Sequence, residues 1–340
     1  MKHSSVAAGP LMAALLCIAP PLASDGRAQA IPRTSGVVTV RGQNVPYLTE
    51  GEGETCIVTG VAPTLPRLYS DRLKKKIRFV FVDFEGSWTA DGTRDVSAVT
   101  MGDLVQEIDD VRRAFGLDRV CLTGHSSTGL VAIEYLARHP EHVSRLFLAD
   151  VHPFWNQRLF DAWKESWERD ASPERKAVLQ ENQKRMPDSL LETLSPSDSF
   201  ALRYVRTAPR LFYDPNYNIL WAMIGHRISA PMLNRYWAVI VKDYDSWDRL
   251  ANVTVPIFVG LGRYDNAVPY QTWQRERDRK NPNITFAMFE KSAHFPMIEE
   301  PKAFDDAVLG WLSKTPAKRV AQQPSSSRVP APSARDPAIP

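Results

Sequence analysis

The sequence predicts an α/β protein in which a mostly parallel β-sheet is covered by helices on both faces. Short apolar runs that end in turn residues alternate with segments of helical periodicity along most of the chain. The runs are continuously apolar, as in strands that are buried on both sides of a parallel sheet. A third observation is a long helix-compatible stretch, residues 154–251, that interrupts this alternation.

Residues 1–30 have the pattern of an export signal. Lys2 precedes an apolar stretch at residues 6–23, and the Ala-Gln-Ala sequence at 28–30 matches the small-x-small pattern of a signal-peptidase site. The apolar stretch contains prolines and is short for a bilayer-spanning helix, which needs about 20 apolar residues. We therefore predict a secreted or periplasmic protein that is cleaved after Ala30 and has no stable membrane insertion after cleavage.

The strands and helices of the predicted core follow the signal in a regular order. Residues 36–50 alternate around a Gly-Gln-Asn turn and predict a β-hairpin. Helical patterns occupy residues 101–115 and 130–138, and the second stops before Pro140. Six apolar runs predict further strands, at residues 56–59, 78–83, 120–123, 143–148, 255–260 and 284–289.

Residues 154–251 predict a helical cap inserted into a sheet domain formed by residues 31–153 and 252–314. A stretch of this length inside a compact domain is rarely without structure. It carries six of the nine tryptophans, and a Ser-Pro-Ser-Asp cluster at residues 195–198 divides it into two halves. A pocket between such a cap and the sheet is expected to be largely apolar and aromatic.

The two ends of the chain account for its positive charge. Residues 315–340 are rich in Pro, Ser, Ala and Arg without apolar periodicity, so we expect a disordered tail. Of the formal net charge of +3, residues 1–30 contribute +1 and residues 315–340 contribute +3, which leaves −1 for the core. This balance argues against nucleic acid as a partner. We expect a small-molecule substrate, and the sequence does not indicate an oligomeric state.

The most informative motif is the Gly-His-Ser-Ser-Thr sequence at residues 124–128. An apolar run stops at Gly124, and an apolar helical pattern begins three residues after Ser126. A serine hydroxyl is a poor nucleophile at neutral pH, so a hydrolase exposes it on a tight strand-to-helix turn, beside a base and facing backbone N–H donors. Ser126 is therefore the candidate nucleophile.

Candidates for the base and its orienting acid follow in the chain order Ser, Asp, His, each just beyond a predicted strand. Asp265 ends a Gly-Arg-Tyr-Asp sequence, and His294 lies in an Ala-His-Phe-Pro sequence. Asp150, which follows the apolar run at residues 143–148, is an alternative acid. The Gly-Arg-x-Asp context favours Asp265.

These motifs resemble those of the α/β-hydrolase family. The resemblance spans most of residues 36–312 and implies an α/β-hydrolase fold, with a mostly parallel central sheet, helices on both faces and an inserted helical cap. It implies that Ser126 attacks a carbonyl carbon to form an acyl-enzyme, that His294 is the general base and that Asp265 orients the imidazole. This chemistry requires neither a cofactor nor a metal.

Two positions depart from the pattern of the family. The oxyanion hole should consist of the backbone N–H groups of Ser127 and Val61. However, residues 59–63 read Thr-Gly-Val-Ala-Pro, where relatives usually carry His-Gly. A misplaced Val61 donor would cost about 3 kcal/mol of transition-state stabilisation. Thr128 stands where the elbow usually has glycine, and we expect slightly looser packing of helix against strand there.

We therefore expect an exported serine hydrolase that cleaves a carboxylic ester or lactone with an apolar or aromatic group. Two other enzyme classes share the triad. One is a proline iminopeptidase-like aminopeptidase or amidase, which residues 162–168 faintly resemble, and the other is a cofactor-free haloperoxidase or perhydrolase. A carbon–halogen hydrolase is disfavoured, because such enzymes usually have an aspartate at the position of Ser126. From a different class, a ligand-binding protein with negligible turnover is the remaining alternative.

The predicted core contains two cysteines, Cys56 and Cys121. Each lies in an apolar run that is typical of a buried strand. In an exported protein such a pair can form a disulfide. We favour free thiols, with a bridge as the alternative.

Overall fold

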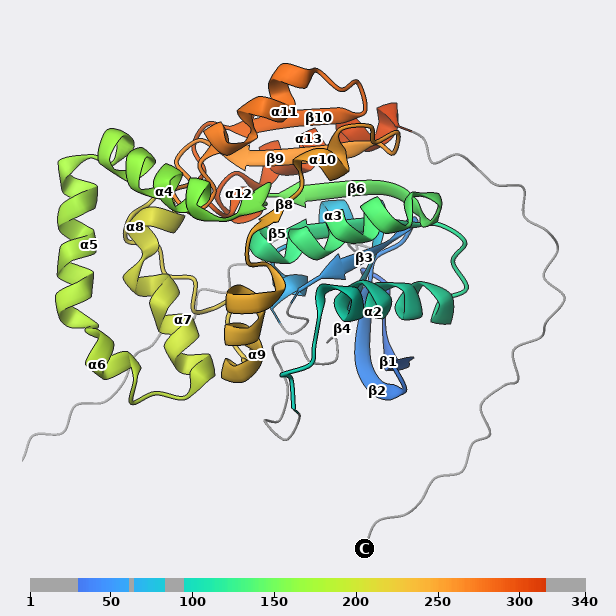
Figure 1. Cartoon of the computed structure of the whole chain (residues 1–340), viewed down its shortest axis with the longest axis horizontal. Coiled ribbons are helices and arrows are strands. Elements are labelled where there is room, and N and C mark those ends of the chain that lie inside the picture. The colour runs from blue at the N-terminus through green and yellow to red at the C-terminus, as the bar shows by residue number, and fades with distance from the viewer. Residues whose placement is uncertain (1–29, 61–63, 83–94, 316–340) are drawn as a thin grey trace, which may run out of the picture. The chain divides into compact units, whose positions relative to one another are not determined.

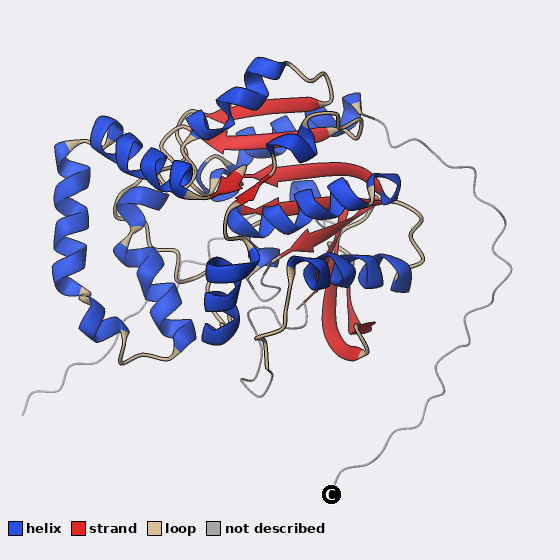
Figure 2. Ribbon diagram, viewed as in Figure 1, coloured by secondary structure: helices blue, strands red, loops and turns tan. Residues whose placement is uncertain are grey.

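The computed structural model describes residues 30–60, 64–82 and 95–315. An eight-stranded sheet forms its centre, in the order β1-β2-β4-β3-β5-β6-β9-β10 (Figure 2). Pairing is antiparallel on both sides of β2 and parallel between all the other neighbours, which confirms the predicted mostly parallel sheet. The strands are β1 (Arg33–Val40), β2 (Gln43–Glu50), β3 (Glu54–Thr59), β4 (Ile77–Val82), β5 (Val120–His125), β6 (Val143–Ala149), β9 (Ile257–Gly262) and β10 (Ile284–Phe289).

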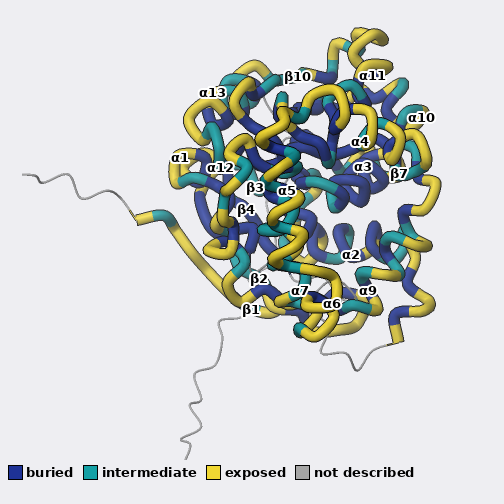
Figure 3. Tube along the Cα trace, turned by 90° about the vertical axis from the view of Figure 1, so that its left-hand side faces the viewer, coloured by how far each residue is buried: buried dark blue, intermediate teal, exposed yellow. Residues whose placement is uncertain are grey.

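Helices cover both faces of the sheet because side chains alternate along the strands. On β4, Val80 and Val82 belong to the core cluster that includes the helices α2 and α3, whereas Phe79 and Phe81 belong to the cluster that includes α13. The central strands β3, β4, β5, β6 and β9 are accordingly almost fully buried, whereas β1 and β2 at the edge are more exposed (Figure 3). The helices packed around the sheet are α1 (Asp71–Lys74), α2 (Met101–Ala114), α3 (Gly129–Arg138), α11 (Gln274–Arg279), α12 (Pro296–Glu299) and α13 (Pro301–Lys314).

The hairpin between β1 and β2 turns one residue earlier than the sequence predicts. Val40 pairs with Gln43, so the two-residue turn consists of Arg41 and Gly42. Their φ angles are 47° and 76°. Two-residue turns of this left-handed kind match the twist of the flanking strands, which explains why Gly42 lies within the turn rather than at its start.

The predicted helix at residues 101–115 begins at a capping box. The Thr100 hydroxyl accepts a hydrogen bond from the Asp103 N–H, and the Asp103 carboxylate accepts one from the Thr100 N–H. Two of the free N–H groups at the helix start are satisfied in this way. The capping box therefore fixes the start of α2 at Met101, as the sequence predicts.

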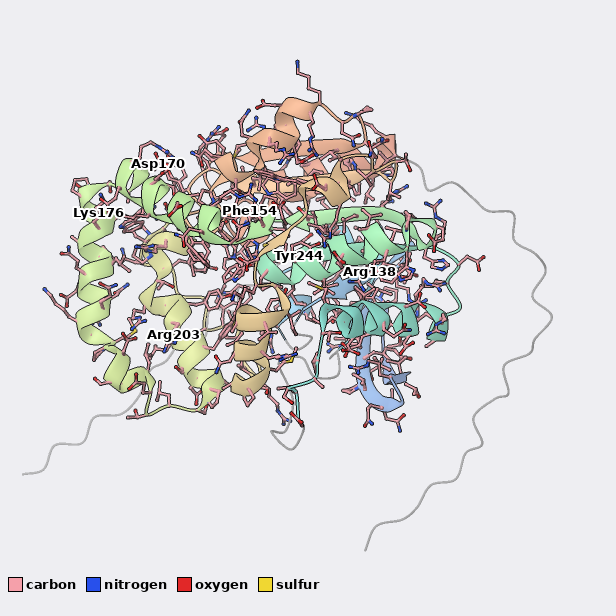
Figure 4. All side chains as sticks on the ribbon, viewed as in Figure 1. Arg138, Phe154, Asp170, Lys176, Arg203 and Tyr244 are labelled. Carbon is pink, nitrogen blue, oxygen red and sulfur yellow. The ribbon has the colours of Figure 1, made fainter. Side chains whose placement is uncertain are left out.

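Residues 154–251, referred to below as the insertion, separate β6 from β9. A short ribbon closes its base, because β7 (Phe154–Trp155) pairs with β8 (Tyr244–Asp245); Figure 4 labels Phe154 and Tyr244. Figure 1 shows α4 to α8 grouped on one side of the sheet. The helices of the insertion are α4 (Gln157–Asp170), α5 (Pro173–Arg185), α6 (Asp188–Leu191), α7 (Pro196–Arg206), α8 (Ala208–Leu211), α9 (Ala230–Arg235), a π-helical turn (Tyr236–Ile240) and α10 (Trp247–Leu250).

Cys56 and Cys121 lie opposite each other on the neighbouring strands β3 and β5. Both are buried free thiols, with their Sγ atoms 2.6 Å apart. Burial, together with the neighbouring sulfur, raises the pKa of the Cys56 thiol well above its usual value. The Cys56 sulfur is therefore poorly suited to act as a thiolate nucleophile.

Within the described ranges, no helix combines the length and the apolar character that a membrane crossing requires. The expected signal at residues 1–30 and the expected tail at residues 315–340 fall almost wholly outside these ranges.

Candidate active site

Ser126 lies on the sharp turn between β5 and α3. Its φ angle is 55°, a left-handed conformation that is strained for a serine. A methyl group added to Gly124 would lie 2.4 Å from the Gly129 Cα atom, so strand and helix approach as closely as backbone allows. The residues around Ser126 thus have the geometry of a nucleophile elbow.

Thr128 does not loosen this turn as the sequence suggested. Its hydroxyl lies 2.9 Å from the Thr59 carbonyl oxygen and 2.8 Å from that of His125. In return, the Thr59 hydroxyl donates to the Thr128 carbonyl at 3.0 Å. Thr128 therefore ties the elbow to the end of β3, where the loop of the expected oxyanion hole begins.

Asp265 and His294 form a direct pair at the carboxyl ends of β9 and β10. The His294 Nδ1 and Asp265 Oδ2 atoms are 2.7 Å apart, and both side chains are buried. The other carboxylate oxygen, Oδ1, accepts hydrogen bonds from the N–H groups of Ala267 and Val268 at 2.7 and 2.9 Å. Asp265 is thus held rigidly, and it directs the Nδ1–H of His294 toward itself, which leaves Nε2 free to accept a proton.

His294 is brought beside the elbow by its contact with His125, the residue before Ser126. The two imidazole rings are 4.7 Å apart, and the His125 Nε2 lies 2.7 Å from the His294 carbonyl oxygen. Within the described chain, no hydrogen bond joins the Ser126 hydroxyl to the His294 ring. Hydrogen bonds between nucleophile and base are often long before substrate binds.

Asp150, the alternative acid, lies behind the pair and does not contact the imidazole through a hydrogen bond. Its side chain is fully buried, and Oδ1 accepts a hydrogen bond from the Gly262 N–H at 2.8 Å. Burial first, and the charge of Asp265 second, raise the pKa of Asp150 well above its usual value. A neutral carboxylic acid at this position avoids placing two negative charges side by side. Asp265, rather than Asp150, is therefore the acid that contacts His294.

Three groups that the sequence reasoning did not single out hold the His294 loop in place. The backbone N–H of His294 donates to the carbonyl oxygen of Leu211, in the insertion, at 2.9 Å. The Glu299 carboxylate accepts a hydrogen bond from the Ala293 N–H at 2.8 Å. Burial raises the pKa of Glu299 to about 7. The third group is His125, whose Nε2 lies 2.7 Å from the His294 carbonyl oxygen. Of the three, only His125 could have been found from the sequence, because it directly precedes Ser126.

Two additional histidines surround His294 in the neutral form. Burial lowers the pKa of His125 to about 3, and the pKa of His152 falls to about 3 for the same reason. The His152 ring packs against Trp155 of the insertion, with 5.2 Å between ring centroids. Because neither histidine is charged near pH 7, neither opposes the positive charge that His294 acquires as a base.

The oxyanion hole is described only in part. Ser127 is buried directly after the nucleophile, and its carbonyl oxygen accepts a hydrogen bond from the hydroxyl of Tyr236 at 2.7 Å. Tyr236 belongs to the insertion, which thus helps to fix the backbone around the first candidate donor. Val61, the second candidate, lies outside the described residues, although Gly60 before it has a φ angle of 135°, which favours glycine.

A cavity of about 140 Å³ lies above Ser126, between the elbow and the insertion. Among the described residues that line it, none is an aspartate, a glutamate, a lysine or an arginine. Most of the wall is apolar and includes Leu65, Leu68, Phe200, Ile219, Met223 and Trp237. The cavity thus joins a serine with an adjacent Asp–His pair to a small apolar chamber.

Comparison with known proteins identifies the family. The sequence profile described as "Alpha/beta hydrolase family" matches residues 58–307. The chain belongs to the α/β-hydrolase family. This α/β hydrolase is 30% identical over 285 residues to the AB hydrolase superfamily protein YclE of Bacillus subtilis, a match that covers 82% of the chain and 99% of YclE.

Two further α/β hydrolases illustrate the range of the similarity. A proline iminopeptidase of Heyndrickxia coagulans is 24% identical, with 82% of this chain and 97% of that protein covered. The solved structure of an alpha/beta fold family hydrolase from Bacillus anthracis superposes with a TM-score of 0.63 at 22% identity, covering 83% and 100% of the two chains. The structural match shows that the fold is shared.

Proposed function

We propose that this α/β hydrolase is a serine hydrolase that cleaves carboxylic esters or lactones with an apolar or aromatic acyl group. His294 Nε2 takes the proton of the Ser126 hydroxyl while the oxygen attacks the carbonyl carbon. The resulting imidazolium then protonates the leaving alcohol. Water attacks the acyl-enzyme with His294 again as the base, and the carboxylic acid leaves.

One observation carries this proposal: a strained serine at the floor of an apolar cavity, beside a histidine whose Nδ1 is held by a buried carboxylate at 2.7 Å. Strain at a residue that is exposed to a cavity persists only where the surrounding structure enforces it. A ligand-binding protein would need the cavity, but not the Asp265–His294 pair.

The cavity supports esters with small acyl groups. Its volume of about 140 Å³ is similar to that of engineered cavities that hold one benzene molecule, on the order of 150 Å³. A phenyl ring or a chain of about six carbons should therefore fit, whereas long fatty acyl chains should not.

An aminopeptidase fits the described cavity less well. A substrate with a free ammonium group needs a buried carboxylate or a similar acceptor nearby. Glu165 and Glu168, within the segment that resembles proline iminopeptidases, are exposed on α4 and do not line the cavity. We therefore favour ester cleavage over amide cleavage as the function, although the relative from Heyndrickxia coagulans is a proline iminopeptidase.

We also propose export of the chain, with residues 1–30 removed as a signal. Support comes from the apolar stretch and the Ala-Gln-Ala sequence before Ile31. Expression of the full chain in a bacterial host, followed by fractionation and N-terminal sequencing, tests this proposal. A mature N-terminus at Ile31 in the periplasm or the medium is expected, and an intact chain in the cytoplasm would contradict it.

Hydrolysis of p-nitrophenyl esters by matched serine variants tests the enzymatic proposal. Ser126→Ala should abolish turnover of p-nitrophenyl butyrate and benzoate. Ser127→Ala, one residue along, keeps the backbone N–H and should retain most of it. Proline p-nitroanilide in the same assay separates peptidase from esterase. A folded wild-type protein that cleaves none of these substrates would favour the ligand-binding alternative.

A further inference from the structure

Two polar side chains from the insertion form part of the cavity wall above Ser126. His226 follows a series of turns after Ile219, and Tyr204 lies on α7. Otherwise the insertion contributes apolar residues to this wall, such as Phe200 and Met223. Among the described residues, the polar side chains that line the cavity are those of the serine elbow, Thr64, and His226 and Tyr204 of the insertion.

Among the described residues, neither ring nitrogen of His226 has a hydrogen-bond partner. The residue is only 7% exposed, and both nitrogens are buried. Its ring packs against that of Phe200, with centroids 5.2 Å apart. Leaving a buried polar group unpaired destabilises the folded state, so native proteins rarely retain one without a purpose.

Tyr204 packs against the same phenylalanine as His226, with its ring centroid 5.1 Å from that of Phe200. The tyrosine is half-buried, and its hydroxyl makes no hydrogen bond within the described part of the chain. Burial raises the pKa of Tyr204 to about 12 and lowers the pKa of His226, with Asp198 on α7 partly opposing the latter shift. At neutral pH, both side chains are uncharged. Together they offer a hydroxyl that donates and accepts, one ring N–H donor and one ring nitrogen acceptor.

We propose that His226 and Tyr204 form a recognition site for an uncharged oxygen-bearing group, a ketone or a hydroxyl, on the acyl part of the substrate. This inference rests on the proposed ester hydrolysis and narrows its substrate class. Because both ring nitrogens of His226 are unpaired, rotating the imidazole toward the cavity breaks no hydrogen bond. We place the acyl part of the substrate, rather than its leaving group, in this cavity. The leaving group must lie near His294, which protonates it, and His294 does not line the cavity.

The chemistry of the wall selects the kind of group that binds. A carboxylate or an ammonium group would enter without a counter-charge, because no charged side chain lines the described cavity. A plain alkyl chain would leave the His226 nitrogens and the Tyr204 hydroxyl unpaired. A ketone or a hydroxyl satisfies them, and a site built to pair such a group discriminates strongly against analogues that lack it.

Matched p-nitrophenyl esters test the proposal. The 4-oxopentanoate and 5-oxohexanoate esters differ from pentanoate and hexanoate by one carbonyl in place of a methylene. We expect the wild type to favour at least one oxo ester over its parent by about 10-fold or more in kcat/KM, after division by the rates of hydroxide-catalysed hydrolysis. His226→Phe and Tyr204→Phe should each reduce that ratio, and His226→Asn, which keeps a donor and an acceptor, should preserve part of it. Met223→Leu alters an apolar part of the same wall and should leave the ratio unchanged.

Thermal unfolding separates recognition from a structural role. His226→Phe replaces an unpaired polar ring by an apolar ring of similar shape, so its Tm should equal or exceed that of the wild type. A lower Tm together with equal losses on both esters would show a structural role and overturn the proposal. A corrected ratio near one in the wild type would overturn it while leaving the esterase function intact. If neither ester is cleaved by folded protein, both proposals fail.

Discussion

Replacing Asp265 by asparagine should disable the base through the geometry of the hydrogen bonds around it. Two backbone N–H groups donate to Oδ1, so the amide oxygen of the asparagine must occupy that position. The amide NH₂ group then faces His294 Nδ1, where Oδ2 now lies at 2.7 Å. To accept from this donor, the imidazole must adopt the tautomer with its proton on Nε2, which cannot remove the proton of Ser126.

The expected magnitude is large. In serine proteases the same wrong-tautomer substitution lowers kcat about 10⁴-fold while the geometry stays intact. We expect a loss of that order for Asp265→Asn, with a much smaller change in KM, measured as p-nitrophenyl butyrate hydrolysis at pH 7.5. The far-UV circular dichroism spectrum should be that of the wild type.

Asp150→Asn is the matched control. Its amide oxygen can keep the hydrogen bond from the Gly262 N–H, and its NH₂ group can take the place of the Oδ2 atom on the side of Asp265. Burial raises the pKa of Asp150, which favours its neutral form, and Asp150 makes no hydrogen bond to the imidazole within the described chain, so kcat should change less than about 10-fold. An active Asp265→Asn enzyme together with an inactive Asp150→Asn enzyme would refute the assignment of the acid.

Three further substitutions test other parts of the account. Gly124→Ala should destabilise the fold by about 1–3 kcal/mol and impair the elbow, because its methyl group would lie 2.4 Å from the Gly129 Cα atom. Urea unfolding measures the loss of stability, and kcat measures the damage to the elbow. A variant as stable as the wild type would refute the close approach. Thr128→Val keeps the side-chain shape but loses the hydroxyl hydrogen bonds to Thr59 and His125. It should lower the free energy of unfolding by about 1–2 kcal/mol and lower kcat. An unchanged kcat would show that these hydrogen bonds do not position the oxyanion loop. Because the pKa of Glu299 is raised to about 7, the folded protein holds a proton that the unfolded chain has released above its carboxyl pKa of about 4.3. This group's contribution to stability should therefore fall between about pH 4.5 and pH 7, by at most about 1.4 kcal/mol per pH unit. Glu299→Gln should remove that part of the pH dependence of unfolding, and an unchanged pH profile would contradict the shift.

Local sequence signals were sufficient for the sheet and for the three residues placed on its loops. Continuous apolar runs located the strands, and the order Ser126, Asp265, His294 placed the three at the same edge of a parallel sheet. The turn at Arg41 and Gly42 was misplaced by one residue, because the sequence does not show which glycine neighbour takes the left-handed conformation.

The roles of residues in the insertion could not be predicted from the sequence. Tyr236 reaches the Ser127 carbonyl, and His226 and Tyr204 reach the cavity, only through the way in which the insertion packs on the sheet. Their spacing in the sequence follows no short motif. From the sequence, Thr128 is only the replacement of a glycine. Its hydroxyl donates a hydrogen bond to the carbonyl oxygen of Thr59, which is distant in sequence. Such roles arise from tertiary contacts, which periodicity does not encode.

The most direct measurement is covalent labelling with a fluorophosphonate, followed by intact-mass analysis and peptide mapping. Wild-type protein should gain one phosphonyl adduct, located on Ser126, and labelling should slow strongly in His294→Ala and vanish in Ser126→Ala. A folded wild-type protein that remains unlabelled, or an adduct on any residue other than Ser126, would contradict the assignment of Ser126 as the nucleophile.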